Sequence, residues 1–345
     1  MAKTKKNLFI HGGYPKCAST SLQDFLFLNK EPLQNKGFLY PAFENKNILT
    51  HERTNGFDIS LFILNDNNEY LNKRFDTLNF PEQERKKYIK NLENSFSYTK
   101  QQINDSNLNN IVLSSEFFSV NSSNILKFKN EFKEFNIKFI FYIRTPVSFI
   151  CSAFQQNAKG ALRNTLPLDE YIDKDLELNI NYFEKFDDYI EVFGKENIIL
   201  RPLENEQFKN GCIYSDFLNI LGLEPDESFS LLKRNSNESS SFEVTELIRL
   251  INRLPYDMEI KNKMRKLALN VQFQNNTKII DTLTEEQIQK IKNKYDPIIS
   301  KYAKELLNQD KMFLNDKYEA KVSKTALNNQ DIEDILKTLT LKINI

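Results

Sequence analysis

The sequence predicts an α/β fold with a central, mostly parallel sheet flanked by helices and a helical C-terminal part. Four short runs have the continuous apolarity and β-branched or aromatic character of buried parallel strands: residues 7–10, 111–113, 137–143 and 197–200. Segments with helical spacing lie between these runs, and alternating strands and helices indicate a parallel sheet. Beyond about residue 205 the pattern is helical throughout.

The first strand is followed by a tight turn and a helix. Gly12 and Gly13 allow the backbone to turn sharply after residue 10. From Ala18 onward, Leu22, Phe25 and Leu26 recur at helical spacing. Five further helices are expected, over residues 81–105, 212–221, 242–253, 257–271 and 285–307, and a second short strand over 38–40.

Charged side chains follow several of the predicted strands. Glu116 comes soon after the strand at 111–113, and Arg144 and Arg201 each end a strand. After Arg144, Thr145 suits a helix N-cap and Pro146 the first helical position. Ligands of open parallel sheets bind beyond the carboxyl ends of the strands, so we expect these side chains to gather there with Lys16.

The 345 residues are enough for one large α/β domain. With 40% hydrophobic and 27% charged residues, a packed core is expected. We predict one domain over residues 1–310, with its sheet core at 7–204 and a helical part at 205–310. Residues 311–345 are expected to form a tail with a short helix.

Composition excludes several classes of function. Lysine plus arginine and aspartate plus glutamate both count 47, and this zero net charge argues against a nucleic-acid binder. Three widely spaced cysteines suit a reducing compartment and provide no disulfide or metal framework. With two histidines and no acidic cluster, no metal is expected. No apolar run reaches the length of a membrane span or signal peptide, so a cytoplasmic location is expected.

The turn before the first helix has the features of a phosphate cradle. A helix start offers unpaired backbone N–H groups and a partial positive charge. Lys16 adds a full charge beside it, and Ser19, Thr20 and Ser21 add hydroxyls in the first helical turn. An ATP-binding Walker loop would end in Gly-Lys-Ser/Thr, whereas here the lysine precedes the small residues.

The arrangement instead resembles the 5′-phosphosulfate loop of sulfotransferases that use 3′-phosphoadenosine 5′-phosphosulfate (PAPS), in particular the bacterial branch with Lys-x-Gly-Thr-Thr-Ser-Leu-Gln. This chain has Ala18 for the usual glycine and Ser19 for a usual threonine. Alanine suits that position if its backbone is helical and fails if a positive φ is required. The resemblance spans about residues 7–255 and implies a P-loop-like fold. It also implies a nucleotide-binding loop made of Tyr14, Pro15, Lys16, Cys17, Ala18, Ser19, Thr20 and Ser21.

Two further stretches carry the resemblance. Arg144 and Ser152 have the spacing of eight residues found at the family's 3′-phosphate site, where charge-assisted bonds to a phosphate contribute about 1.5–3 kcal/mol each. Lys233 and Arg234 resemble part of the Arg-Arg-Asn-x-Ser segment that closes over the nucleotide near that phosphate. Ser239 or Ser240 is then expected to cap the next helix.

The chemistry of sulfuryl transfer assigns roles to a few side chains. Negative charge builds on the departing phosphate oxygen, and Lys16 is predicted to stabilise it. Glu116 is the first choice for the general base that removes the acceptor proton, and His51 is the second. A salt bridge that holds the loop is the alternative role for Glu116. His11 is expected to be a strand-end residue with its hydrogen bonds satisfied, packed under the loop.

The predicted function is therefore transfer of the sulfuryl group from PAPS to a hydroxyl or amine, with no metal. By family resemblance, the expected acceptor is a carbohydrate, namely a cell-surface glycan or glycolipid precursor. Two alternatives stay open: a P-loop-like kinase that uses ATP, and a non-catalytic nucleotide-binding relative. The sequence leaves the oligomeric state open.

Overall fold

The computed structural model describes residues 5–14, 16–41, 55–64, 71–72, 75–76, 80–120, 124–160, 162–177, 183, 185–232, 240–273 and 276–318. The chain divides into two compact units, and each is described by itself. Unit 1 comprises residues 1–144, 181–233 and 299–314, and unit 2 comprises residues 145–180, 234–298 and 315–345.

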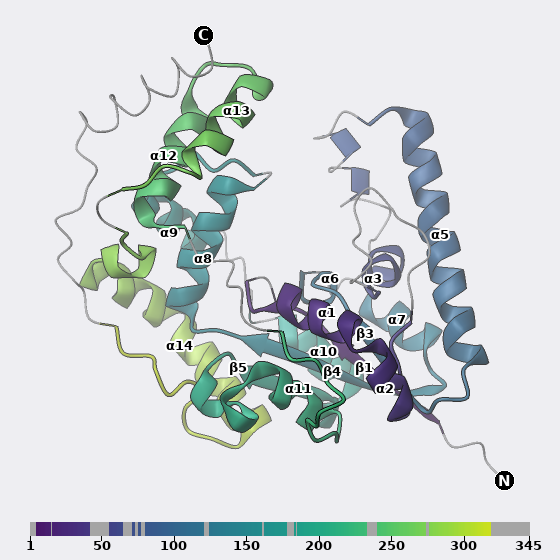
Figure 1. Cartoon of the computed structure of the whole chain (residues 1–345). Helices are drawn as coiled ribbons and strands as arrows, with labels where there is room; N and C mark the ends of the chain where they lie inside the picture. Colours follow the sequence, from purple (N-terminus) through teal and green to yellow (C-terminus); the bar gives the residue numbers. More distant parts are fainter. Residues whose placement is uncertain are drawn as a thin grey trace. The chain divides into compact units, whose positions relative to one another are not determined.

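Unit 1 is built on a five-stranded sheet in the order β2-β3-β1-β4-β5. Figure 1 labels β1, β3, β4 and β5 of this sheet. The strands are β1 (Lys6–His11), β2 (Phe38–Leu39), β3 (Asn110–Ser114), β4 (Phe135–Ile143) and β5 (Ile198–Pro202). All neighbouring pairs are parallel, with β1 at the centre between β3 and β4. The α/β fold with a central parallel sheet, predicted from the sequence, is confirmed.

Helices cover both faces of this sheet because alternate side chains of a strand point to opposite faces. On β4, Phe139 and Phe141 pack against Tyr189 and Phe186 of α10 (Lys185–Phe193), with ring centroids 4.7 and 4.9 Å apart. Tyr142 faces the other way and donates a hydrogen bond of 2.8 Å to Asp216 on α11 (Ile213–Ile220). Phe139, Phe141 and Tyr142 are all fully buried, which explains the near-continuous apolar run of this strand.

Within the described residues, six further helices belong wholly to unit 1: α1 (Ser19–Leu28), α2 (Lys30–Asn35), α3 (Phe57–Leu64), α5 (Glu82–Asp105), α6 (Phe117–Val120) and α7 (Ile125–Glu131). Short 3₁₀ turns lie at Lys195–Asn197, Asn205–Gln207 and Lys209–Gly211. The predicted charged helix at 81–105 is confirmed as α5. It buries one stripe, which includes Tyr88, Leu92 and Ile103, and leaves its charged residues outside.

Unit 2 is helical. It contains α8 (Pro146–Lys159), α9 (Leu168–Glu177), α12 (Phe242–Arg253), α13 (Met258–Ala268), the 3₁₀ turn Ile279–Thr282 and α14 (Glu285–Leu307), whose last turns, from Ile299, count with unit 1. As predicted, Thr145 caps α8 by accepting a hydrogen bond from the Ser148 N–H, and Pro146 stands at the first position. The cap of α12 is Ser241, so the prediction of Ser240 is wrong. Ser239 lies outside the described residues.

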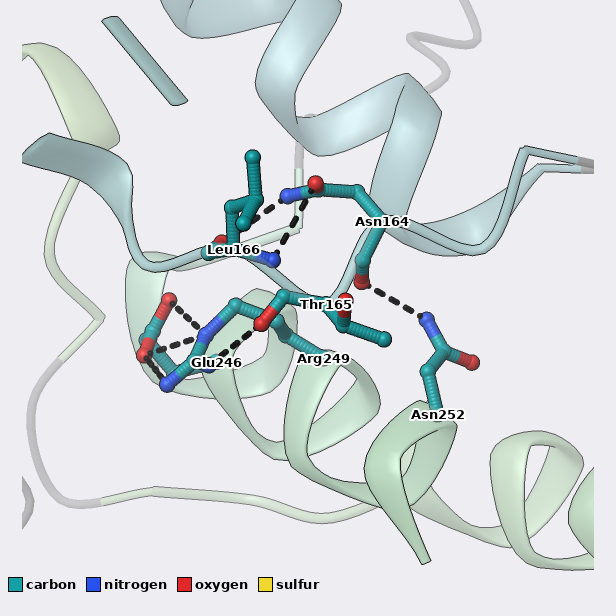
Figure 2. A network of polar contacts seen from close by, with 6 residues as sticks. All are labelled: Asn164, Thr165, Leu166, Glu246, Arg249 and Asn252. Atoms are coloured by element: carbon teal, nitrogen blue, oxygen red, sulfur yellow. Dashed lines mark hydrogen bonds and ion pairs between the residues drawn. The ribbon is translucent and has the colours of Figure 1, made fainter. Parts of the chain in front are cut away.

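A polar network ties the loop after α8 to α12 (Figure 2). The Arg249 guanidinium binds the carboxylate of Glu246, with Nη2–Oε2 at 2.8 Å, and donates to the Thr165 carbonyl at 3.0 Å. One turn on, the Asn252 amide donates to the carbonyls of Asn164 and Ala158. The side chains of α12 thereby fix the backbone of this loop.

The chain is described as far as residue 318, so the short helix predicted for the tail lies outside the described residues. The division into a domain at 1–310 and a tail at 311–345 stays a prediction. Among the helices that the structure describes, none has the length and apolar character needed to cross a membrane.

Candidate active site

The turn after β1 needs both of its glycines. A Cβ atom on Gly12 would lie 2.0 Å from the ring of Phe141, so a larger residue would displace that core side chain. Gly13 has a φ of +38°, and its Cβ would lie 3.2 Å from Glu116. The glycine pair thus brings the turn close to the residue that follows β3.

Two residues without glycine's freedom adopt left-handed backbone in the same turn. Lys16 has a φ of 62° and Ala18 a φ of 61°. The condition set by the sequence, that alanine at position 18 requires a helical backbone, is therefore not met. Left-handed backbone costs a residue with a Cβ roughly 1–2 kcal/mol, so Ala18 is strained where glycine would not be.

Two buried side chains, Tyr14 and Cys17, anchor the turn to the core. Tyr14 is 1% exposed, and its ring stacks on Phe183 with centroids 5.8 Å apart. Cys17 is fully buried, and its N–H donates to the Tyr14 carbonyl at 3.0 Å. The side chains of Tyr14 and Cys17 therefore face the core. Pro15 lies outside the described residues.

Lys16, Glu116 and Arg144 come together around this turn. Burial lowers the pKa of the Lys16 amine, the charge of Arg144 lowers it further, and Glu116 acts in the opposite direction. Burial raises the pKa of the Cys17 thiol to about 12, although hydrogen bonds from the Arg144 backbone and side chain oppose this. Two cations and one carboxylate, from three different strand ends, thus meet at the start of α1, as the sequence predicts for a parallel sheet.

The hydroxyls at the start of α1 point in different directions. Ser19 is 3% exposed and donates a hydrogen bond to the Glu116 carboxylate. Thr20 is exposed. The Ser21 hydroxyl lies 2.6 Å from the hydroxyl of Tyr214 on α11. The Tyr214 ring stacks on Phe25, with ring centroids 4.8 Å apart.

Burial raises the pKa of Glu116, whereas the Ser19 hydrogen bond and the charge of Lys16 lower it. A carboxyl whose pKa is raised by burial is a stronger base than an exposed one, which suits proton abstraction near neutral pH. The charges of Lys16 and Glu116 attract each other, which agrees with the alternative role of Glu116 in holding the loop.

Arg201, the fourth charged strand-end residue, binds other residues of unit 1 in a structural role. Its guanidinium forms an ion pair with Asp216, which is 1% exposed, and donates to the Gln207 carbonyl at 2.8 Å. The same carboxylate accepts hydrogen bonds from Tyr142 and from the Lys209 N–H. Arg201 therefore joins β5 to α11.

The remaining predicted site residues are Ser152, His51, Lys233 and Arg234. Ser152 is half-buried on α8 of unit 2, whereas Arg144 belongs to unit 1. His51, Lys233 and Arg234 lie outside the described residues.

His11 is buried, as expected, but only one of its two ring nitrogens has a hydrogen-bond partner among the described residues. It is fully buried, its Nδ1 lies 2.8 Å from the Ser114 hydroxyl, and its ring meets Phe217 edge-on. Burial lowers its pKa to about 3, so the imidazole is neutral. Within the described part of the chain, Nε2 has no hydrogen-bond partner.

Tyr214 is a site neighbour that sequence reasoning missed. It lies 193 residues from Ser21 along the chain, so no local pattern links them. No group of three or more His, Cys, Asp or Glu side chains suitable for a metal is found among the described residues.

No family model matches the sequence. An uncharacterized protein of Archaeoglobus fulgidus is 28% identical over 142 residues, which are 41% of this chain and 38% of that protein, so the match covers well under two thirds of that relative.

Similar solved structures include a sulfotransferase from Alicyclobacillus acidocaldarius, with 14% identity, a TM-score of 0.45 and coverage of 90% of this chain and 98% of that chain. Mouse sulfotransferase SULT7A1 complexed with PAP has 11% identity, a TM-score of 0.40 and coverage of 98% and 89%. The sulfotransferase domain from the curacin biosynthetic pathway has 14% identity, a TM-score of 0.39 and coverage of 86% and 99%. These solved structures bear the name of the family that the sequence motifs resemble.

Proposed function

We propose that this chain is a sulfotransferase that moves the sulfuryl group of PAPS to a hydroxyl or amine of an acceptor. The observation that supports this function best is the meeting of Lys16, Arg144 and Glu116 at the first turn of α1. Arg144 lowers the pKa of the Lys16 amine, and two neighbouring cations suit a site for a multiply charged anion, which relieves their repulsion. Backbone N–H groups at a helix start add to the attraction.

In the proposed reaction, PAPS supplies an activated sulfate. The acceptor oxygen or nitrogen forms a bond to sulfur while the bond from sulfur to the 5′-phosphate oxygen breaks. Lys16 stabilises the charge that develops on the departing phosphate oxygen, and Glu116 receives the acceptor proton. Ser19, Thr20 and Ser21 hold the 5′-phosphate with the backbone of the turn.

The 3′-phosphate is assigned to Arg144 and Ser152, and the closing segment to Lys233 and Arg234. These assignments rest on motif spacing. His51 is kept as the second choice for the base. The proposal includes a cytoplasmic location and a cell-surface glycan or glycolipid precursor as the acceptor, both carried over from the sequence.

The first test is calorimetric binding of adenosine 3′,5′-bisphosphate (PAP), with ADP as the comparison. The proposal expects PAP to bind more tightly than ADP, because ADP lacks the 3′-phosphate that Arg144 would bind. Tighter binding of ADP, together with phosphate transfer from ATP, would instead support the kinase. Binding of PAP without transfer to any acceptor would support the non-catalytic relative.

The second test is release of PAP from PAPS in the presence of carbohydrate and glycolipid acceptors. Lys16→Ala is expected to lower turnover by a factor of about 10² to 10³, the usual cost of losing one transition-state donor. Lys30→Ala, at the start of α2, is the matched control that removes a lysine outside the site. If Lys16→Ala retains full transfer, the leaving-group role is wrong.

A further inference from the structure

Ser19 occupies a position between the proposed phosphate site and the proposed base. It is the first residue of α1, and its hydroxyl donates to Glu116 Oε1. Glu116 is packed against the turn, since its Cα and Cγ lie 3.2 Å from where a Cβ of Gly13 would stand. Residues 97 positions apart are therefore joined at the helix start.

A serine hydroxyl has one proton to donate. A phosphate held at the first turn of α1 would be a second anionic acceptor for that proton. When the phosphate takes the hydrogen bond, Glu116 loses a partner that favours its charged form. The phosphate also brings negative charge near the carboxylate, and both changes favour the protonated carboxyl.

We infer that Ser19 links nucleotide binding at this turn to protonation of Glu116, so that occupation of the phosphate site increases the proton affinity of the base. This inference rests on the proposed function. Its balance is simple: at most one proton passes from solvent to the Glu116 carboxylate for each nucleotide bound.

The other groups around Glu116 permit this linkage. The charge of Glu116 acts on Lys16 and Cys17 in the turn, and Arg144 at the end of β4 acts on the same two residues. In the free protein, the Ser19 hydrogen bond comes before the charge of Lys16 among the influences that lower the pKa of Glu116. The Ser19 hydrogen bond is thus the main influence that opposes the rise in the Glu116 pKa caused by burial. A bound phosphate would take this hydrogen bond away from Glu116.

The linkage has a consequence for the reaction. A general base works best when its pKa lies near the working pH. Glu116 would be a weaker base in the free protein and a stronger one once the donor is bound. The base would therefore reach its full strength only when sulfate is present to be transferred.

The experiment is calorimetry of PAP binding near neutral pH in several buffers with different heats of ionisation. The slope of the observed enthalpy against the buffer's heat of ionisation counts the protons taken up. Wild-type protein is expected to take up more protons than Glu116→Gln, by a fraction of one proton, because a pKa near the working pH leaves part of the Glu116 carboxylate unprotonated to act as the base. Protonation of the PAP phosphates is common to both proteins and cancels in the difference.

Two serine variants sharpen the test. Ser19→Ala already lacks the hydrogen bond in the free protein, so its proton uptake should fall below that of wild type. Ser19→Thr keeps a hydroxyl and should retain the wild-type count. In transfer assays, the pH profile of kcat should have its acid limb at a higher pH than that of kcat/KM for wild type, and Ser19→Ala should narrow this gap.

The outcomes separate the inference from the proposed function. Equal proton uptake by wild type and Glu116→Gln, with PAP bound to both, would overturn the inference and leave the sulfotransferase proposal intact. Failure of wild type to bind PAP would refute the proposed function itself. Thermal melting of each variant shows that the compared proteins are folded.

Discussion

The polar network of unit 2 in Figure 2 and the turn at residues 12–21 of unit 1 differ in how their charged side chains are paired. In the network, Arg249 is 6% exposed and binds Glu246 and a carbonyl, so its charge is neutralised within the protein. In the turn, Lys16 lies near a second cation, Arg144, and its backbone is left-handed. The network stabilises a loop, whereas the turn holds unfavourable features that a bound anion would relieve.

The largest expected effect tests the network. Glu246→Leu leaves the Arg249 guanidinium buried without its carboxylate, which should lower the free energy of unfolding by about 3 kcal/mol. Urea denaturation measures this loss, and the double variant with Arg249→Leu should recover most of it. PAP binding should be unchanged. A loss of under about 1 kcal/mol would show that the network contributes little.

The second effect concerns the buried His11 at the end of β1 and depends on pH. His11 has a folded-state pKa of about 3 against 6.5 when exposed, so the unfolded chain binds more protons between these values. Its contribution to stability is complete above pH 6.5 and is lost as the pH falls, by about 2 kcal/mol between about pH 7 and pH 5.

Denaturation as a function of pH checks this, with His11→Phe as the variant that cannot titrate. The variant should lack this part of the acid destabilisation. Parallel stability curves for wild type and variant over that range would contradict the buried, neutral state of His11. Glu116 titrates in both proteins and cancels in the comparison.

The third effect tests the strain in the turn. Ala18→Gly should raise the free energy of unfolding by about 1 kcal/mol, because glycine accepts the left-handed φ without a Cβ clash. Ala153→Gly, inside α8, is the control and should lower it by a similar amount. Equal destabilisation by both substitutions would mean that residue 18 is not strained.

The smallest effect concerns Tyr214. Tyr214→Phe removes the hydrogen bond to Ser21 and keeps the ring that stacks on Phe25. A neutral hydrogen bond contributes about 1 kcal/mol or less, so PAP should bind about threefold more weakly. In a Ser21→Ala background the same substitution should have no effect on the dissociation constant. An additive loss in the double variant would assign Tyr214 to helix packing alone.

Much of this molecule is predictable from sequence because its signals are local. The strand runs are apolar where the central strands are buried, and α12 and α14 have the predicted bounds, helped by a cap or an acidic first turn. Helices α2, α3, α6, α7, α9 and α10 were not predicted. The segment Phe57–Leu64 is apolar on most sides and contains no polar face that would reveal a helical period.

The features of the candidate site also separate into those that local sequence patterns predict and those that depend on contacts between distant residues. The meeting of Lys16, Glu116 and Arg144 at strand ends could be predicted from the topology of a parallel sheet. The pairing of the fourth strand-end residue, Arg201, with Asp216 could not.

The positive φ of Ala18 could not be predicted, because alanine is not one of the residue types, mainly glycine and asparagine, that indicate left-handed backbone in a sequence. The contacts from Ser19 to Glu116 and from Ser21 to Tyr214 span 97 and 193 residues, and only the folded chain brings them together.

The central place of β1 in the sheet has a consequence for biosynthesis. Its partners are β3 and β4, so Asn7 must wait for Asn110 and Asn136 before its strand is paired on both sides. At a synthesis rate of roughly 5–20 residues per second, this delay is on the order of ten seconds. During that interval the nascent chain exposes an apolar strand next to the ribosome, and a chaperone that shields short hydrophobic segments would protect it until translation has supplied both neighbours.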